Sequence, residues 1–297
     1  MVNVRQAVPT TADGTLDWAA WVTRILAEYP QLTAQPLMDC CAWIQQQHAD
    51  QLAVSLELAE LVAELRLDTA SVLAALAYRL VRTERVSKAD LQTQIGAEAT
   101  ELVFSVAAMA TTSLLEMSDS PMLAKEQQSQ VENVKRMLAS MIDDARVAAI
   151  KLAERVLALR QAKDYEPQRR QRIAQEAGSI FSPLANRLGI WHLKWELEDL
   201  SLRYLREDIY LGIAKQLSQK RQQREQQVAA MTEHVVALLG DQGINAEVAG
   251  RAKNIFSIWR KMQAKNIPIQ EVYDVRAVRI IVESLADCYV ALGIIHT

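Results

Sequence analysis

A succession of helix-period segments fills the first half of the chain and constrains its fold most strongly. Apolar residues recur there every three or four positions, and no stretch shows sustained alternation of apolar and polar residues. Short polar or proline-containing breaks separate the segments, and the chain has only nine glycines, which suits helices with short connections. We predict helices over residues 18–29, 36–47, 52–65, 69–81, 87–95, 98–113, 131–141 and 148–159.

The composition is that of a globular protein with length for about two domains. Half of the 297 residues are hydrophobic, and a net charge of −3 argues against a general polyanion-binding surface, so any nucleotide site must be a local basic patch. Cys40, Cys41 and Cys288 have neither metal-ligand spacing nor a disulfide framework, which favours a reducing cytoplasm. We expect no membrane span, because the chain lacks an export signal and an apolar run of about 18 residues.

Two charged runs lie in the middle of the chain. Residues 168–177 contain RRQR, and residues 216–227 read QLSQKRQQREQQ. Gln and Glu interleave the basic residues, and no aromatic side chains do, so solvated helix faces are favoured over a nucleic-acid interface.

The segment from Gly250 to Arg279 combines basic side chains with alternating strands and helices. Arg251 and Lys253 are two residues apart, so an extended backbone would send both side chains to one face. Guanidinium, ammonium and hydroxyl groups near a helix start suit a polyphosphate, and Asp274 could hold Mg²⁺ beside it. Gly250 would provide a tight turn or a close approach of the backbone to a ligand. We predict strands over 244–251 and 274–283 and helices over 254–264 and 285–294, an α/β element with a sheet at its centre.

The same pattern also has an ordinary structural explanation. Basic residues on an amphipathic helix are more often a solvated face than a phosphate site, and an Asp that opens a strand is commonly turn chemistry. The residues alone therefore leave both interpretations open.

Two strings in this segment, RAKNIFSIWRKM (251–262) and YDVRAVRI (273–280), resemble the opening of the synthetase domain in the long RelA/SpoT family. These enzymes make and degrade (p)ppGpp. Other family-like strings are AALAYRL (74–80), NVKRMLASMIDD (133–144), IKLAERVLALR (150–160), SPLANRLGIWHLKWELEDL (182–200) and CYVALGIIHT (288–297). The resemblance covers the chain from about residue 56 onward and is closer to the synthesis-only RelA branch.

The resemblance implies a mainly α chain in three parts. Residues 1–165 would form an all-helical pseudo-hydrolase domain of the His-Asp type, and residues 166–235 a helical bridge. Residues 236–297 would begin an α/β nucleotidyltransferase-like synthetase domain, whose sheet the chain is too short to complete.

In this family a divalent metal, usually manganese, is held by a His, a His-Asp pair and a later Asp. The matching positions carry Val54, Tyr78, Arg79 and Glu154. Arg82 and Thr83 replace a following acidic pair, and Ala158 replaces an expected Asn. Val, Tyr and Arg cannot substitute for imidazole and carboxylate ligands, so we expect no Mn²⁺ in this domain. His48, the one histidine in residues 1–165, is interpreted as a surface or capping residue.

The resemblance also implies transfer of a pyrophosphoryl group from ATP to the 3′-hydroxyl of GTP or GDP, with Mg²⁺. Asp274 would hold the metal and, with Lys261, act in catalysis, although Asp274 shares a face with Arg279 only if it precedes the strand or a bulge intervenes. The roles implied at the donor are Arg251 and Arg279 beside the adenine, and Lys253, Ser257 and Lys261 at the phosphates. The acceptor-side Tyr and Glu, and a region that senses uncharged tRNA on the ribosome, would lie beyond residue 297, so we expect this piece not to complete the reaction.

Three hypotheses follow for the function. The favoured one is the donor half of a (p)ppGpp synthetase behind an inactive hydrolase domain, in the cytoplasm. The second is a catalytically incomplete regulatory or nucleotide-binding module, which could form a homo-oligomer. The third, an active His-Asp phosphohydrolase, is nearly excluded by the lost ligands.

Overall fold

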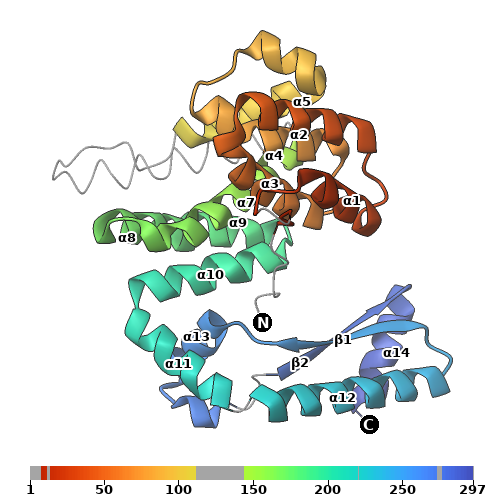
Figure 1. Cartoon of the computed structure of the whole chain (residues 1–297). Helices are drawn as coiled ribbons and strands as arrows, with labels where there is room; N and C mark the ends of the chain where they lie inside the picture. Colours follow the sequence, from red (N-terminus) through yellow and green to blue (C-terminus); the bar gives the residue numbers. More distant parts are fainter. Residues whose placement is uncertain (1–7, 12–13, 112–143, 220, 273–275, 297) are drawn as a thin grey trace. The chain divides into compact units, whose positions relative to one another are not determined.

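The computed structural model describes residues 8–11, 14–111, 144–219, 221–272 and 276–296 (Figure 1). They form two compact units that divide between Ser201 and Leu202. This division falls within the bridge predicted over residues 166–235, and the three-part domain division itself stays a prediction. No helix in the described ranges is long and apolar enough to cross a membrane.

The first unit is built from α-helices, of which α10 runs across the division. Their bounds are α1 Trp18–Glu28, α2 Ala34–Gln47, α3 Ala49–Glu64, α4 Thr69–Arg82, α5 Lys88–Thr111, α7 Ala145–Gln161, α8 Pro167–Glu176, α9 Ser182–Arg187 and α10 Trp191–Leu205. A 3-10 turn follows α7 at Ala162–Asp164, and a π-helical turn precedes α9 at Ala177–Phe181.

Most of the predicted helices are confirmed within a few residues of their ends. The two predicted over 87–95 and 98–113 form the single element α5, which is kinked at Gly96, where φ is +81°. This left-handed conformation favours glycine. The helix predicted over residues 131–141 lies outside the described residues.

Aspartates begin three of these helices. The carboxylates of Asp17, Asp68 and Asp144 accept hydrogen bonds from the backbone N–H groups of Ala20, Ser71 and Arg146, each at 2.9 Å. Such N-caps satisfy amide groups that the first helical turn leaves without a partner. They set where α1, α4 and α7 begin, and therefore where the later residues of α4 and α7 lie.

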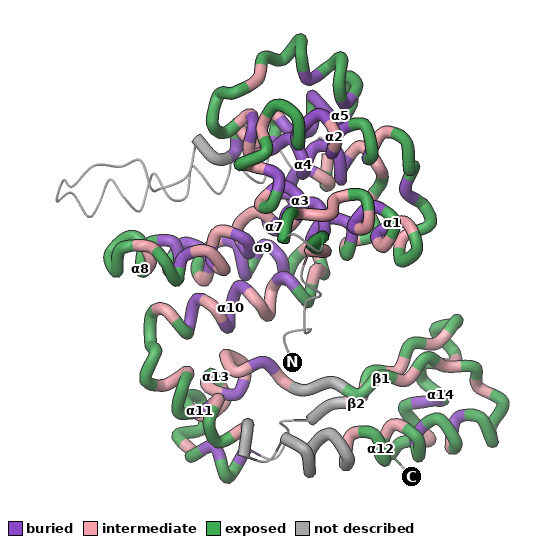
Figure 2. The backbone as a smooth tube through the Cα atoms, in the orientation of Figure 1, coloured by how far each residue is buried: buried purple, intermediate pink, exposed green. Residues whose placement is uncertain are grey.

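The core of the first unit lies among α3, α4 and α7 (Figure 2). Leu56, Leu76, Leu152 and Val156 are fully buried there. The last two were predicted to mark the apolar face of the helix over 148–159, and their burial confirms that register.

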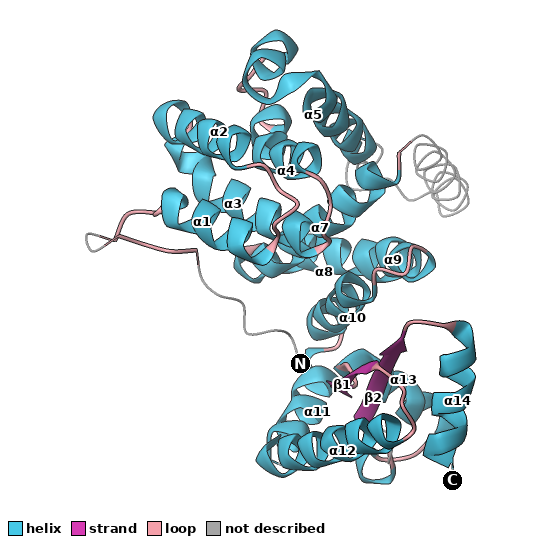
Figure 3. Cartoon of the chain, turned by 90° about the vertical axis from the view of Figure 1, so that its right-hand side faces the viewer, coloured by secondary structure: helices cyan, strands magenta, loops and turns pink. Residues whose placement is uncertain are grey.

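The second unit contains a two-stranded antiparallel sheet with helices beside it (Figure 3). Its elements are α11 Glu207–Gln219, α12 Arg221–Asp241, β1 Ala246–Ala252, α13 Ile255–Lys265, a 3-10 turn at Ile269–Glu271, β2 Arg276–Val282 and α14 Leu285–His296. The predicted order of strand, helix, strand, helix is therefore confirmed.

Alternating strand residues give this sheet one covered face. Val248 and Ile280 lie opposite each other and pack against Val235 and Leu239 of α12. Arg279 belongs to the other parity and is exposed. The helix α13 packs separately, through Ile258, in a cluster with α11.

Gly250 does not lie in a tight turn, which was one of the two roles that we expected. It lies within β1, where a Cβ atom would overlap Cγ1 of Val228 and lie 3.2 Å from Oγ1 of Thr232. One close approach that favours glycine is therefore to α12, and the approach to a ligand stays a prediction.

Candidate functional site: an arginine-lined pocket in the helical unit

A cavity of about 330 Å³ opens beside α3, α4, α7 and α8 in the first unit. Its lining residues are Val54, Leu58, Tyr78, Arg79, Arg82, Glu154, Arg155, Leu157, Ala158, Gln161, Tyr165, Arg169, Arg172 and Ile173. The structure thus brings together all four positions aligned with the family's metal ligands: Val54 from α3, Tyr78 and Arg79 from α4, and Glu154 from α7.

The described lining residues include one carboxylate, that of Glu154, and no His, Cys or Asp. No described residues form a group of three or more His, Cys, Asp or Glu that could hold a metal ion. His48 lies between α2 and α3 and places its ring against Trp43, with ring centroids 5.5 Å apart, which agrees with a capping position.

The carboxylate of Glu154 is already bound by two cations. Lys151 Nζ donates to Oε2 at 2.8 Å, and Arg155 donates through Nε to Oε2 and through Nη2 to Oε1, both at 2.7 Å. Burial alone would raise the pKa of Glu154, but Arg155 and Lys151 together outweigh burial and lower it. Glu154 is therefore an anion whose side chain is only 13% exposed and whose charge is compensated.

Lys151 contributes a buried ammonium group that sequence reasoning missed. Only 1% of its side chain is exposed, and burial lowers its pKa to about 8, against the attraction of Glu154. The ammonium also lies 6.0 Å from the ring centroid of Tyr78. At neutral pH the ammonium remains charged because Glu154 is its partner. The sequence signal that could have identified Lys151 is a lysine on the core face of an amphipathic helix.

The hydroxyl group of Tyr78, near Lys151 and Glu154, has no hydrogen-bond partner in the described structure. Only 2% of the residue is exposed. Burial and the nearby charge of Glu154 raise the pKa of Tyr78, so its hydroxyl stays protonated. The Nε atom of Arg79 is likewise buried without a partner.

Guanidinium groups dominate the pocket lining. Among the described lining residues, five arginines face one carboxylate, and Arg82, Arg169 and Arg172 are exposed at the rim. Arg169 and Arg172 belong to the RRQR run, which we interpreted as a solvated helix face. That interpretation is incomplete, because their spacing of three puts them on one side of α8 together with Ile173, toward the pocket.

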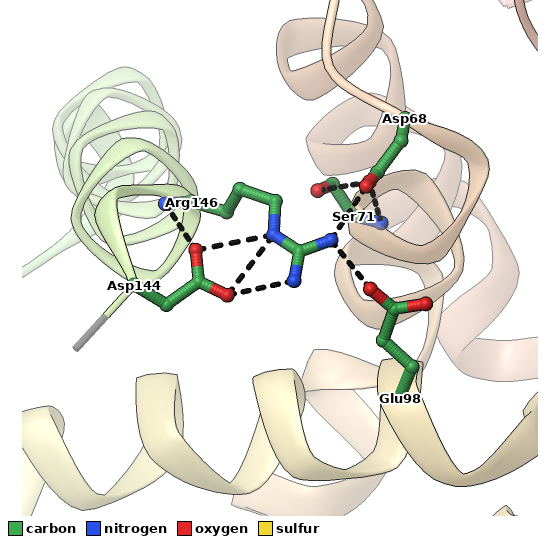
Figure 4. A network of polar contacts seen from close by, with 5 residues as sticks. All are labelled: Asp68, Ser71, Glu98, Asp144 and Arg146. Carbon is green, nitrogen blue, oxygen red and sulfur yellow. Dashed lines mark hydrogen bonds and ion pairs between the residues drawn. The ribbon is translucent and has the colours of Figure 1, made fainter.

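A polar network fixes the start of α7, the helix that carries Glu154 (Figure 4). The guanidinium of Arg146 contacts Asp144 at 2.7 Å, Asp68 at the start of α4 at 2.5 Å and Glu98 of α5 at 2.8 Å. One side chain thereby joins three helices. The hydrogen bond to Asp144, followed by those to Glu98 and Asp68, raises the pKa of Arg146, so the guanidinium stays charged.

The residues predicted to bind ATP lie in the second unit. Lys253 follows β1 directly, and Ser257 and Lys261 lie one turn apart on α13, all three half-buried. Arg279 lies opposite Ala249 in the sheet. Asp274 lies outside the described residues, and the side chain of Arg251 is not described, so convergence of the set on one ligand stays a prediction.

Comparison with known proteins matches both parts of the chain. The profile described as "HD domain" matches residues 33–191, and that described as "Region found in RelA / SpoT proteins" matches residues 250–297. The class that these matches and the helical pocket define is an HD-domain protein with a RelA/SpoT region.

Curated relatives are similar along most of the sequence. GTP pyrophosphokinase of Escherichia coli (strain K12) is 40% identical over 307 residues, which cover 100% of this chain and 40% of that protein. GTP pyrophosphokinase of Photobacterium angustum is 45% identical over 243 residues, covering 81% of this chain and 32% of that protein. A probable guanosine-3′,5′-bis(diphosphate) 3′-pyrophosphohydrolase of Synechocystis is 35% identical over 246 residues, which cover 82% of this chain and 31% of that protein.

The chain belongs to the RelA/SpoT family. It spans at most 40% of the length of these three relatives.

Proposed function

We propose that this chain is the N-terminal part of a (p)ppGpp synthetase whose HD domain does not hydrolyse (p)ppGpp. The observation that carries the second half of this proposal is the state of Glu154. It is the one carboxylate among the described lining residues, and Lys151 and Arg155 already bind it.

This donor set does not fit Mn²⁺. A dication would have to displace an ammonium and a guanidinium from Glu154, next to the guanidinium of Arg79. Tight binding of such a metal takes several deprotonated oxygen or nitrogen ligands, and one carboxylate is not enough. Hydrolysis through a metal-bound water therefore has no support from the residues present.

The synthetase half of the proposal is supported by the relatives named GTP pyrophosphokinase and by the match over residues 250–297. In this reaction the 3′-hydroxyl of GTP or GDP attacks the β-phosphorus of ATP, and AMP leaves. Lys253, Ser257 and Lys261 would bind the donor phosphates, and Arg251 and Arg279 would flank the adenine. Asp274 would hold Mg²⁺, which neutralises charge on the phosphates.

The proposal is tested by two assays on the full-length gene product. Incubated with ATP, GDP and Mg²⁺, the protein should form ppGpp, and incubated with ppGpp and Mn²⁺ it should leave ppGpp intact. Consumption of ppGpp would refute the inactive hydrolase. Failure to form ppGpp would favour the alternative, a catalytically incomplete regulatory or nucleotide-binding module.

Variants of the donor residues test the assigned roles. Lys253→Ala removes a charged hydrogen bond to the phosphates, so ATP affinity should fall by about ten- to a hundredfold. Asp274→Asn should nearly abolish ppGpp synthesis and its dependence on Mg²⁺. Lys265→Ala is the matched control, because it removes an exposed cation from the last turn of α13. Full synthesis by the Asp274→Asn protein would remove Asp274 from the mechanism.

A further inference from the structure

We propose that Val228 of α12 is a positioning residue for ATP binding, through its contact with Gly250 in β1. The inference rests on the proposed function, because it takes residues between 251 and 279 to bind ATP. It adds a residue outside that segment. Val228 acts on the bound nucleotide only through the backbone of the strand.

The contact joins a side chain of α12 to the backbone of β1. A Cβ atom at Gly250 would lie 2.1 Å from Cγ1 of Val228 and 3.2 Å from Oγ1 of Thr232. A β-branched side chain in a helix has one strongly preferred χ1 rotamer, so Val228 cannot turn away without cost. No side chain therefore separates the helix from the strand at Gly250.

The same side of α12 packs on the rest of the sheet through side chains. Val235 and Leu239 of α12 pack with Val248 and Ile280, which lie opposite each other in the two strands. Val228 precedes Val235 by seven residues, which is close to two helical turns. It therefore continues the stripe of α12 that faces the sheet, and at this point the helix meets the strand backbone directly (Figure 3).

Residues that we assign to ATP lie next to this contact. Arg251 follows Gly250 directly, and Lys253 follows the end of β1. Arg279 lies opposite Ala249, one residue before Gly250, and is exposed on the other face of the sheet from α12. The contact therefore fixes the backbone from which Arg251 and Lys253 continue, and it does so from the covered face.

The size of the overlap shows what a lost fit would do. Carbon atoms in contact are about 3.5–4.0 Å apart, whereas a Cβ at residue 250 would lie 2.1 Å from Val228. A methyl group there would push β1 and α12 apart by about 1 Å or more. Misplacement by about 1 Å can lower a rate about a hundredfold, because bound groups react only in a narrow geometry.

Variants at residue 228 of the full-length gene product test the role directly. Val228→Leu lengthens the side chain toward Gly250, so the Kd for ATP with Mg²⁺ should rise by about tenfold or more, and the KM for ATP with it. The KM for GDP should stay unchanged. Val228→Thr keeps the branched shape, and its hydroxyl can bond the backbone one turn earlier, so its Kd should be that of the parent. An unchanged Kd in Val228→Leu would overturn the proposal.

Val235→Ala is the matched control for a merely structural role. It truncates a buried side chain of the same helix, on the same face, away from Gly250. The melting temperature should fall, and the Kd for ATP should stay that of the parent at a temperature where both proteins are folded. If Val235→Ala raises the Kd as much as Val228→Leu does, lost stability explains the effect and the proposal fails.

Gly250→Ala tests the same contact from the strand. The single change should raise the Kd for ATP by about tenfold or more. Combined with Val228→Ala, which makes room for the new methyl group, it should regain most of the lost affinity, as expected for two residues in contact. A double variant as weak as the single one would place the defect elsewhere and contradict the pairing.

The same titrations separate this inference from the proposed function. A parent protein that binds ATP and forms no ppGpp would refute the proposed synthetase, while the Kd values of the variants still decide the role of Val228. A parent protein that binds no ATP would overturn both.

Discussion

Glu154 illustrates how the surroundings of one residue decide its chemistry. It aligns with a family metal ligand and retains a carboxylate, so its sequence position alone leaves metal binding open. In the structure Lys151 and Arg155 bind both oxygens, and Tyr78 and Arg79 line the same pocket. The buried Lys151 ammonium needs this anion as a partner, so the role of Glu154 in the fold is to stabilise a buried charge.

Replacing Glu154 with Gln should destabilise the helical unit at neutral pH. The change leaves Lys151 buried without a compensating anion, and removal of one partner from a buried ion pair typically costs about 3–5 kcal/mol. Glu101→Gln is the control, because Glu101 is 62% exposed and pairs with an exposed Lys88. Chemical denaturation should show a large loss of stability for the first variant and little change for the second.

The destabilisation by Glu154→Gln should also depend on pH. The pKa of Glu154 is lower in the folded protein than its ordinary value of 4.5. The stabilisation from its charge is therefore complete above about pH 4.5 and is lost as the pH falls through the folded pKa. Denaturation at pH 7 and at pH 3.5 should show a smaller difference between parent and variant at the lower pH. A difference that grows on acidification would contradict the assignment.

The helices show what periodicity predicts well and what it misses. The apolar stripe over residues 148–159 predicted a buried face, and Leu152 and Val156 are fully buried. Periodicity describes burial and says nothing of which charged side chains meet in space. Arg169 and Arg172 reach the pocket because α8 turns back beside α7, a consequence of tertiary packing that a charged run cannot reveal.

Leu152→Ala should cost about 2–5 kcal/mol of stability, because it removes a fully buried side chain from the core and leaves a cavity. Met38→Ala is the comparison in the same unit, since Met38 is 40% exposed and its truncation should change stability by about 0.5 kcal/mol or less. Thermal melts of both proteins decide the matter. Equal melting temperatures would show that α7 packs in a different register.

Gly250→Ala should destabilise the second unit by about 1–3 kcal/mol, because the new Cβ overlaps Val228 on α12. A second change, Val228→Ala, should recover part of this loss by making room. Denaturation of the single and double variants measures the coupling between the two sites. Strict additivity would show that the glycine is not needed for the packing of α12 on β1.

At the scale of the whole molecule, the mainly α architecture and the order of elements could be predicted from the sequence. The alternating pattern after residue 244 predicted strands and helices, and the register of Arg279 opposite Ala249 came only from the structure. The aligned letters Val54, Tyr78 and Arg79 predicted a loss of metal ligands, which stays a prediction. The basic pocket could not be predicted from the sequence, because it combines side chains more than 90 residues apart, from Arg79 to Arg172.

The central claim is that the helical unit has replaced a metal site with a cationic pocket. The measurement that tests it most directly is equilibrium dialysis of this chain against micromolar Mn²⁺, followed by elemental analysis. The account predicts far less than one manganese per chain, and no increase for Arg79→Ala, because one ion-paired carboxylate cannot hold the metal. One tightly bound manganese per chain that is lost in Glu154→Gln would contradict the account.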